Sequence, residues 1–129
     1  MKKIRMVVIG YGDRGSIYAS YALQEKEQVE VVAVVDVSKD RLNLAKKIHG
    51  LNDNQLFTDV DEFLRSGIEC DYIVNATMDQ QHYDVLKKIL PLGKYVLTEK
   101  PIVNSKEKLL ELKAIADKSG STVFVGHVL

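Results

Sequence analysis

The fold is decided by residues 7–15, Val7-Val8-Ile9-Gly10-Tyr11-Gly12-Asp13-Arg14-Gly15, where an apolar run passes directly into three glycines. The spacing G-x-G-x-x-G after a strand and before a helix is typical of a turn that holds a pyrophosphate. In such a turn the first glycine permits the bend, the second lets the backbone approach the ligand, and the third lets the helix pack on the strand. The helix N-terminus then binds the anion. The alternative interpretation is a plain strand-to-helix turn without a ligand.

Short runs rich in valine and isoleucine alternate along the chain with longer amphipathic segments. The run Val31–Val35 is apolar at consecutive positions, a pattern typical of strands that are covered on both faces. Strands are predicted at residues 4–9, 29–35, 56–58, 72–75, 95–98 and 122–125. The alternation predicts an α/β fold, a doubly wound parallel sheet (Rossmann) of about six strands, with five helices on its two faces and right-handed crossovers.

The ends of the helical segments carry their own signals. Four glycines each follow such a segment, where a left-handed residue commonly ends a helix: Gly50, Gly67, Gly93 and Gly120. Thr58 with Asp61, and Asn104 with Glu107, have the three-residue spacing of a cap at a helix start.

The whole chain, residues 1–129, is predicted to be one domain, because its length suffices for one core and is too short for two. Lysine plus arginine and aspartate plus glutamate number 18 each, so no basic field suggests nucleic acid. Cys70 is the one cysteine, which fits a reducing cytosol. No stretch approaches the roughly 20 apolar residues of a membrane span, and no residue cluster has metal-ligand spacing. We therefore expect a soluble, cytoplasmic protein without membrane, nucleic-acid or metal partners.

Asp36 ends the second predicted strand, 21 residues after Gly15, close to the roughly 20 expected of an acid that binds the adenosine ribose. Its carboxylate would accept hydrogen bonds from both ribose hydroxyls and repel a 2′-phosphate, so NAD is favoured and NADP remains possible. Ser38, Lys39 and Arg41 follow closely, and a cation there could receive that phosphate. We interpret these three residues as a helix cap and a solvated first turn.

Two further loops, Ala76-Thr77 and Glu99-Lys100-Pro101, are predicted at the carboxyl edge of the same sheet. Ligands of an open α/β sheet bind at that edge, so three loops converge on one crevice. Pro101 restricts Lys100 to an extended backbone, which fixes the direction of its side chain. A lysine at the nicotinamide end could stabilise charge on a reacting oxygen or share in proton transfer, and Glu99 could orient it or bind the nicotinamide ribose. The alternative is a solvated Glu–Lys pair at a strand end.

The sequence resembles the N-terminal half of the Gfo/Idh/MocA family, which groups glucose–fructose oxidoreductase with inositol dehydrogenase. The resemblance covers the whole chain, and Glu99-Lys100-Pro101 is its most specific part. The remaining matching residues are Gly10, Tyr11, Gly12, Asp13, Arg14, Gly15, Asp36, Ala76, Thr77 and His82. The resemblance implies that these residues form the cofactor site of a nicotinamide-dependent dehydrogenase or reductase that acts on sugars, polyols or related compounds. In that family the residue corresponding to Lys100 is the catalytic or substrate-positioning lysine. Met78 departs from the pattern, because the family commonly has proline there.

Members of that family continue into a second domain that binds the small-molecule substrate and usually forms the oligomer interface. That domain is absent from this chain, so we expect a fragment of a homo-oligomeric parent enzyme that is inactive alone. One alternative is a dinucleotide-sensing regulatory domain, which would need no positioned lysine; another is an S-adenosylmethionine-dependent methyltransferase domain. His127 would face the crevice from the last strand. We assign no function to His49, a cation near a helix C-terminus, or to Cys70, which lacks basic neighbours.

Overall fold

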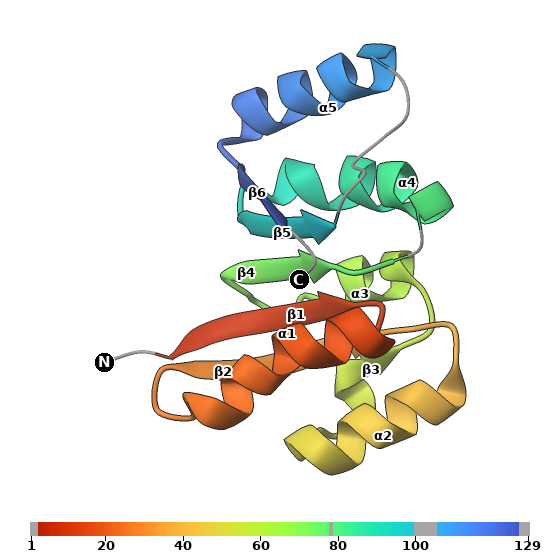
Figure 1. Ribbon diagram of the computed structural model, residues 1–129, viewed down its shortest axis with the longest axis vertical. Helices are drawn as coiled ribbons and strands as arrows, with labels where there is room; N and C mark the ends of the chain where they lie inside the picture. Colours follow the sequence, from red (N-terminus) through yellow and green to blue (C-terminus); the bar gives the residue numbers. More distant parts are fainter. Residues whose placement is uncertain (1–2, 78, 100–105, 127–129) are drawn as a thin grey trace.

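The computed structural model describes residues 3–77, 79–99 and 106–126, and within them the chain forms a six-stranded, wholly parallel sheet (Figure 1). The strand order is β3-β2-β1-β4-β5-β6. The strands are β1 (Ile4–Ile9), β2 (Val29–Val35), β3 (Leu56–Phe57), β4 (Tyr72–Asn75), β5 (Tyr95–Glu99) and β6 (Thr122–Gly126). The predicted doubly wound α/β fold is confirmed, and no predicted strand end differs from the observed one by more than one residue.

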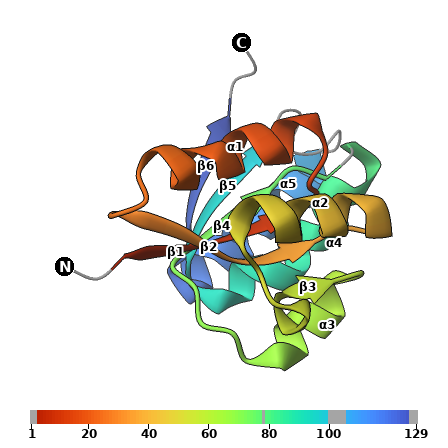
Figure 2. The same cartoon turned by 90° about the horizontal axis from the view of Figure 1, so that it is seen from below.

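Helices cover both faces of the sheet. They are α1 (Asp13–Gln24), α2 (Lys39–His49), α3 (Val60–Ser66), α4 (Asp79–Ile89) and α5 (Lys106–Ser119), with 3-10 turns at Asp53–Gln55 and Leu90–Leu92. Figure 2 shows α1 and α2 on one side of the strands and α3 on the other. None of these helices, within the described ranges, is long and apolar enough to cross a bilayer.

Alternate residues of the central strands pack into two separate hydrophobic cores, one on each face of the sheet. Met6 and Val8 pack with residues of α1 and α2, whereas Val7 and Ile9 pack with residues of α3, α4 and α5. Because successive side chains of a strand point to opposite faces, a strand between two helical layers has to be apolar at every position. This is the physical reason for the continuous apolar runs in the sequence.

The sheet reverses its winding direction between β1 and β4. These two strands are neighbours, with Ile9 opposite Asn75, and the chain winds outward from them to β3 on one side and to β6 on the other. The connections after β1 and β4 therefore lead away from each other, to β2 on one side and to β5 on the other, and the crevice outside the carboxyl ends of these two strands is where such sheets bind ligands.

The amino ends of the same two strands are joined by Arg5 and Asp71. The Arg5 amide and Nε donate to Asp71 Oδ2 at 2.9 and 3.1 Å, and Arg5 Nη2 donates to Oδ1 at 3.1 Å. The hydrogen bonds from Arg5 lower the pKa of Asp71 to about 2. The two central strands are thus held at the edge opposite the crevice.

One predicted helix cap is wrong by a single residue. The side chain that caps α3 is Asp59, which accepts a hydrogen bond from the Glu62 amide at 2.8 Å, whereas Thr58 Oγ1 donates to Glu62 Oε1 at 2.8 Å. The same backbone hydrogen bond from Glu62 lowers the pKa of Asp59. Asn104, the other predicted cap, lies outside the described residues. The four glycines predicted to end helical segments all have positive φ, from 67° to 81°.

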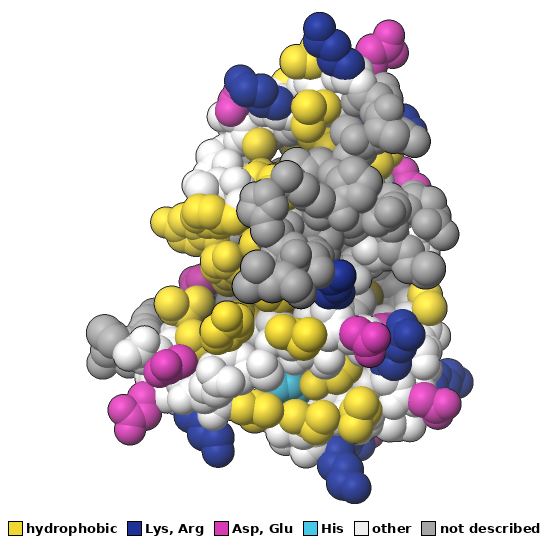
Figure 3. Space-filling view, viewed as in Figure 1, with side chains coloured by type: hydrophobic (Ala, Val, Ile, Leu, Met, Phe, Trp, Pro, Cys, Tyr) yellow, Lys and Arg dark blue, Asp and Glu magenta, His cyan; other side chains and the backbone are white. Residues whose placement is uncertain are grey.

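An aromatic stack lies on the part of the sheet that α1 and α2 leave uncovered. Tyr72, Tyr95 and Phe124 come from β4, β5 and β6, with ring centroids 6.3 to 6.4 Å apart. Tyr95 and Phe124 are 53% and 45% exposed. In Figure 3, hydrophobic side chains gather at the left beside these strands.

Candidate functional site

The glycine turn brings the backbone of three segments into direct contact. Gly10 has φ +90°, and a Cβ at this position would lie 2.7 Å from the carbonyl oxygen of Ala76. A Cβ at Gly15 would lie only 1.7 Å from the carbonyl oxygen of Gly10. Both positions therefore require glycine. Only then can α1 start directly above β1 while the loop after β4 touches the turn.

Gly12 has a different reason to be glycine. A Cβ there would meet the Arg41 guanidinium at 3.5 Å, an ordinary contact, and its φ of −84° suits any residue. Gly12 precedes the first residue of α1 and has no side chain to cap the helix. The backbone amides at this end can therefore face a ligand, and a helix N-terminus favours an anion. Asp13 and Arg14 are exposed in the first turn of α1 and line the cleft at the carboxyl ends of β1, β2 and β4.

Asp36 is the most strongly held polar side chain of the site. Its side chain is 3% exposed, and its two oxygens accept hydrogen bonds from the Tyr11 amide at 2.7 Å and the Ser38 amide at 2.8 Å. The sequence predicts Asp36 to bind the adenosine ribose, and in the structure its carboxylate joins the glycine turn to the end of β2. A carboxylate has about four acceptor positions, so two remain for ligand hydroxyls.

Arg41 occupies a place that the sequence interpretation did not assign to it. Ser38 caps α2, since its Oγ accepts from the Arg41 amide at 3.3 Å, as predicted. The Arg41 side chain, however, is not simply a solvated part of the first turn: its Nη1 lies 3.8 Å from Asp36 Oδ2, and its guanidinium lies beside Gly12. Lys39 is exposed at the first position of α2. Of the two cations, Arg41 is the one that lines the cleft.

The side chain of Tyr11 points away from the cleft, into the layer between the sheet and α2. It is 3% exposed, and its hydroxyl is 2.9 Å from Nε2 of His49. Burial lowers the pKa of His49, which favours the neutral ring over the cation considered for this helix end. Tyr11 thus presents only its backbone to the ligand side, while its ring anchors the turn.

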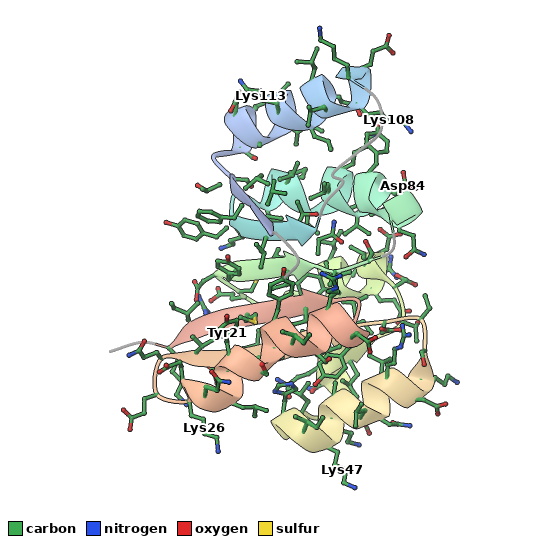
Figure 4. The ribbon with its side chains drawn as sticks, viewed as in Figure 1. Tyr21, Lys26, Lys47, Asp84, Lys108 and Lys113 are labelled. Carbon is green, nitrogen blue, oxygen red and sulfur yellow. The ribbon has the colours of Figure 1, made fainter. Side chains whose placement is uncertain are left out.

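The loop after β4, Ala76-Thr77, is joined by its backbone to the end of β1, just before the glycine turn. The Ala76 amide donates to the Ile9 carbonyl at 2.8 Å, and Thr77 Oγ1 donates to Asn75 Oδ1 at 2.7 Å. Both Ala76 and Thr77 line the cleft. The opposite wall comes from α4, including Asp84, which is labelled in Figure 4.

The cleft has a volume of about 610 Å³ and collects the ends of β1, β2 and β4. A larger hollow of about 720 Å³ lies beside β3, near the amino edge of the sheet, and is lined by Arg5, Asn54 and Glu69 among others. We favour the first as the ligand site, because the glycine turn, the helix N-terminus and the buried carboxylate of Asp36 all face it.

Several predicted site residues lie outside the part of the chain that the structure describes. Lys100, Pro101, Met78 and His127 are not among the described residues. His82 lies in α4 and Glu99 ends β5, so both belong to elements at the carboxyl edge, but their side chains are also outside the described set. Cys70 is buried, and burial raises the pKa of its thiol. In the residues that the structure describes, no three His, Cys, Asp or Glu side chains group as metal ligands would.

Known proteins match this chain along nearly its whole length. A family model described as an oxidoreductase family with an NAD-binding Rossmann fold (GFO_IDH_MocA) matches residues 4–127. The rhizopine catabolism protein MocA of Rhizobium meliloti is 27% identical over 128 residues, which make up 98% of this chain and 38% of that protein. The chain therefore spans little more than a third of the length of this curated relative.

Solved structures show the same fold. The WlbA dehydrogenase of Bordetella pertussis, solved in complex with NADH and UDP-GlcNAcA, superposes with a TM-score of 0.85 at 23% identity, over 97% of this chain and 37% of that one. An NAD-binding protein of Listeria innocua superposes with a TM-score of 0.80 at 27% identity, over 96% of this chain and 35% of that one.

Two glycines of the turn, Gly12 and Gly15, should respond differently to alanine. Gly15→Ala forces a methyl group into the Gly10 carbonyl and should destabilise the fold by about 1–3 kcal/mol, as overpacking does. Gly12→Ala meets only the flexible end of Arg41, so we expect a loss of no more than about 1 kcal/mol at this cap position. Its methyl group would nevertheless occupy the approach to the helix N-terminus and weaken dinucleotide binding.

Urea unfolding and calorimetric titration with NADH measure the two effects separately. Gly12→Ala is itself the matched control for Gly15→Ala, because neither position has a positive φ and the added Cβ meets a backbone atom closer than 3 Å only at Gly15. Equal stability loss in Gly12→Ala and Gly15→Ala, or unchanged NADH affinity in Gly12→Ala, would contradict the assignment of separate roles.

Proposed function

The chain belongs to the Gfo/Idh/MocA oxidoreductase family and is its NAD-binding Rossmann domain, and we propose on that premise that it is the cofactor-binding domain of a dehydrogenase or reductase. That enzyme would transfer a hydride between the nicotinamide and a sugar, polyol or related small molecule. The observation that carries the proposal is the cleft at the switch point of the sheet, where Gly12, Asp36 and Thr77 face one space. Because the curated relative is much longer, substrate binding, catalysis and oligomer formation are proposed for a longer protein that contains this domain.

The cleft suggests how the cofactor lies. We assign the pyrophosphate to the backbone of Gly12 and the first turn of α1, where the amides and the helix dipole favour an anion. The adenosine ribose then reaches Asp36, which keeps acceptor positions after bonding the Tyr11 and Ser38 amides. Val37, whose side chain is exposed next to Asp36, offers an apolar surface to the adenine. The nicotinamide extends toward Thr77 and the end of β5.

The Asp36 carboxylate supports a preference for NAD over NADP. A 2′-phosphate would approach a buried negative charge that already accepts two hydrogen bonds. Arg41 acts in the opposite direction, since its guanidinium borders the same pocket, but it lies within 3.8 Å of Asp36 and is partly neutralised by it. The geometry therefore supports NAD as the main cofactor and Arg41 as the group that would hold any bound NADP.

We predict that the chain binds NADH more tightly than NADPH. Asp36→Asn removes the charge but keeps one acceptor oxygen, and should weaken NADH by roughly 1.5–3 kcal/mol, the contribution of a charge-assisted hydrogen bond. The same change should narrow the gap between NADH and NADPH, because the repulsion of the phosphate disappears. Calorimetric titration of both cofactors measures this, with urea unfolding as a check that the turn remains folded.

Arg41→Ala and Lys39→Ala are a matched pair of variants that test which cation would hold the 2′-phosphate of NADPH. Of these two residues Arg41 lines the cleft and Lys39 does not, so Arg41→Ala should lower NADPH affinity, whereas Lys39→Ala should leave both cofactors unchanged. Tighter binding of NADPH than NADH by the wild-type chain would overturn the preference. If Arg41→Ala and Lys39→Ala changed NADPH affinity equally, Arg41 would have no special contact with the 2′-phosphate.

Lys100 is proposed as the catalytic residue of the longer enzyme. It is the next residue in the sequence after Glu99, the last residue of β5, and β5 ends at the carboxyl edge to which the nicotinamide is assigned. An ammonium group there would stabilise negative charge on the substrate oxygen as the hydride moves, which is worth on the order of 100- to 1000-fold in rate.

We predict that Lys100→Ala in the longer enzyme lowers turnover by that factor and leaves the NADH dissociation constant nearly unchanged. Lys100→Arg should rescue only part of the rate, because a planar guanidinium does not reproduce a compact ammonium charge. Steady-state turnover and NADH binding are measured for both variants. Wild-type turnover in Lys100→Ala would show that Glu99-Lys100-Pro101 is a structural turn.

A further inference from the structure

Asn75 is a buried amide at the centre of an otherwise apolar sheet. It is the last residue of β4 and is fully buried, paired with Ile9 of β1 on one side and Thr98 of β5 on the other. The other residues of β4, Tyr72, Ile73 and Val74, all pack in the apolar cores. Burying an amide costs free energy unless its hydrogen bonds are made, and asparagine is unfavourable in strands. Packing alone therefore does not explain this residue.

The side chain of Asn75 hydrogen-bonds to the loop after its own strand and to the end of β5. Its Oδ1 accepts from Thr77 Oγ1 at 2.7 Å and from the Thr77 amide at 3.4 Å, and its Nδ2 donates to Thr98 Oγ1 at 3.4 Å. Because a backbone amide can only donate, the contact with Thr77 sets the orientation of the side-chain amide. Thr98 is itself 1% exposed. One side chain thus connects the loop after β4 to the end of β5.

Both connected segments belong to the ligand edge. Thr77 and Ala76 line the cleft, and Ala76 also touches Gly10 of the glycine turn. Thr98 directly precedes Glu99, the residue at which β5 ends. Asn75 is fully buried and is not among the described residues that line the cleft, so we infer that it acts on a ligand through the residues it bonds, Thr77 and Thr98 among them.

We propose that Asn75 is a positioning residue for the nicotinamide half of the cofactor. It holds the Ala76-Thr77 loop in the conformation that lines the cleft, and it fixes that loop relative to the end of β5. This inference rests on the proposed binding of NAD at the switch point. According to this inference, Asn75 holds the Ala76-Thr77 loop and the end of β5 in fixed positions before the ligand binds. Such preorganisation lowers the entropy cost of binding.

The test is to replace Asn75 by leucine, which has nearly the same shape and no polar atoms. The melting temperature should fall, because Asn75→Leu leaves the Thr77 amide and the buried Thr98 hydroxyl without their Asn75 partner. A purely structural amide would cause no more than this loss of stability, whereas a positioning amide should also weaken NADH binding at temperatures where the variant is folded. The NADH dissociation constant should rise about tenfold, the effect of losing one well-placed hydrogen-bonded contact. Ile73→Val, in the same strand and equally buried, is the matched control; it should lower the melting temperature slightly and leave NADH binding unchanged.

Two further readouts separate this idea from the proposed function. Hydrogen exchange at the Thr77 amide, measured without cofactor, should become about tenfold faster in Asn75→Leu, because its acceptor is gone. Thr77→Val removes the hydroxyl donor from the other side of the bond, so Asn75→Leu combined with Thr77→Val should weaken NADH no further than the more harmful single change.

Unchanged NADH affinity in a folded Asn75→Leu protein would overturn the proposal, as would additive losses in the double variant. If Asn75→Leu fails to fold, Thr98→Val, which removes the buried hydroxyl that accepts from Asn75 Nδ2, must still weaken NADH and speed exchange at the Thr77 amide, and failure of either overturns it. Absence of NADH binding by the wild-type chain would count against the proposed function instead, and exchange at the Thr77 amide would then decide on Asn75.

Discussion

The close approach of backbone at Gly10 and Gly15 is the constraint on which the ligand edge depends. No atom larger than hydrogen fits on the Cα of Gly15 facing the Gly10 carbonyl, or on that of Gly10 facing Ala76. Because these contacts are made by backbone, α1 begins directly over β1 and points its N-terminus at the space beyond the strand. The same contacts bring the loop after β4 against the turn. A bulkier residue at either place would separate the segments that line the cleft.

Asp36 adds the electrostatic part of the same arrangement. A carboxylate with only 3% of its side chain exposed is stable in this position because the Tyr11 and Ser38 amides donate to it. Tyr11 is held from its other end by His49, so the turn is fixed by its backbone and by its ring. The acid that is assigned to the ribose is therefore oriented by the fold itself. Binding needs little rearrangement on this side of the cleft, which favours affinity.

The sequence predicts the sheet well because the physics of its strands is local. A run such as Val29–Val35 is apolar throughout since both faces are covered, and that pattern is visible without coordinates. Polar strand ends are harder: Glu99 still pairs with Gly126, which no hydrophobic pattern indicates. At the α3 start, Thr58 and Asp59 can both cap a helix, and only the backbone geometry selects Asp59.

The side chains of the site depend on contacts between distant segments, and these were predicted less completely. The spacing from Gly15 to Asp36 predicts this acid as the ribose ligand, but its bond to the Tyr11 amide, between residues 25 positions apart, is not visible in that spacing. Arg41 lies over Gly12 because of how α2 packs, which its sequence neighbours do not show. Asn75 could have been noticed as the one amide in an apolar strand. Its bonds to Thr77 and Thr98 required the register of β4 and β5.

The central claim is that the dinucleotide binds at the carboxyl edge of the sheet between β1 and β4. The most direct test is an NMR titration of the nitrogen-15-labelled chain with NADH, followed at the backbone amides. We predict that the amides of Gly12, Ser38 and Thr77 shift progressively, while those of Asn54 and Glu69, beside the larger hollow near β3, stay in place. Shifts confined to Asn54, Glu69 and their neighbours would contradict the account.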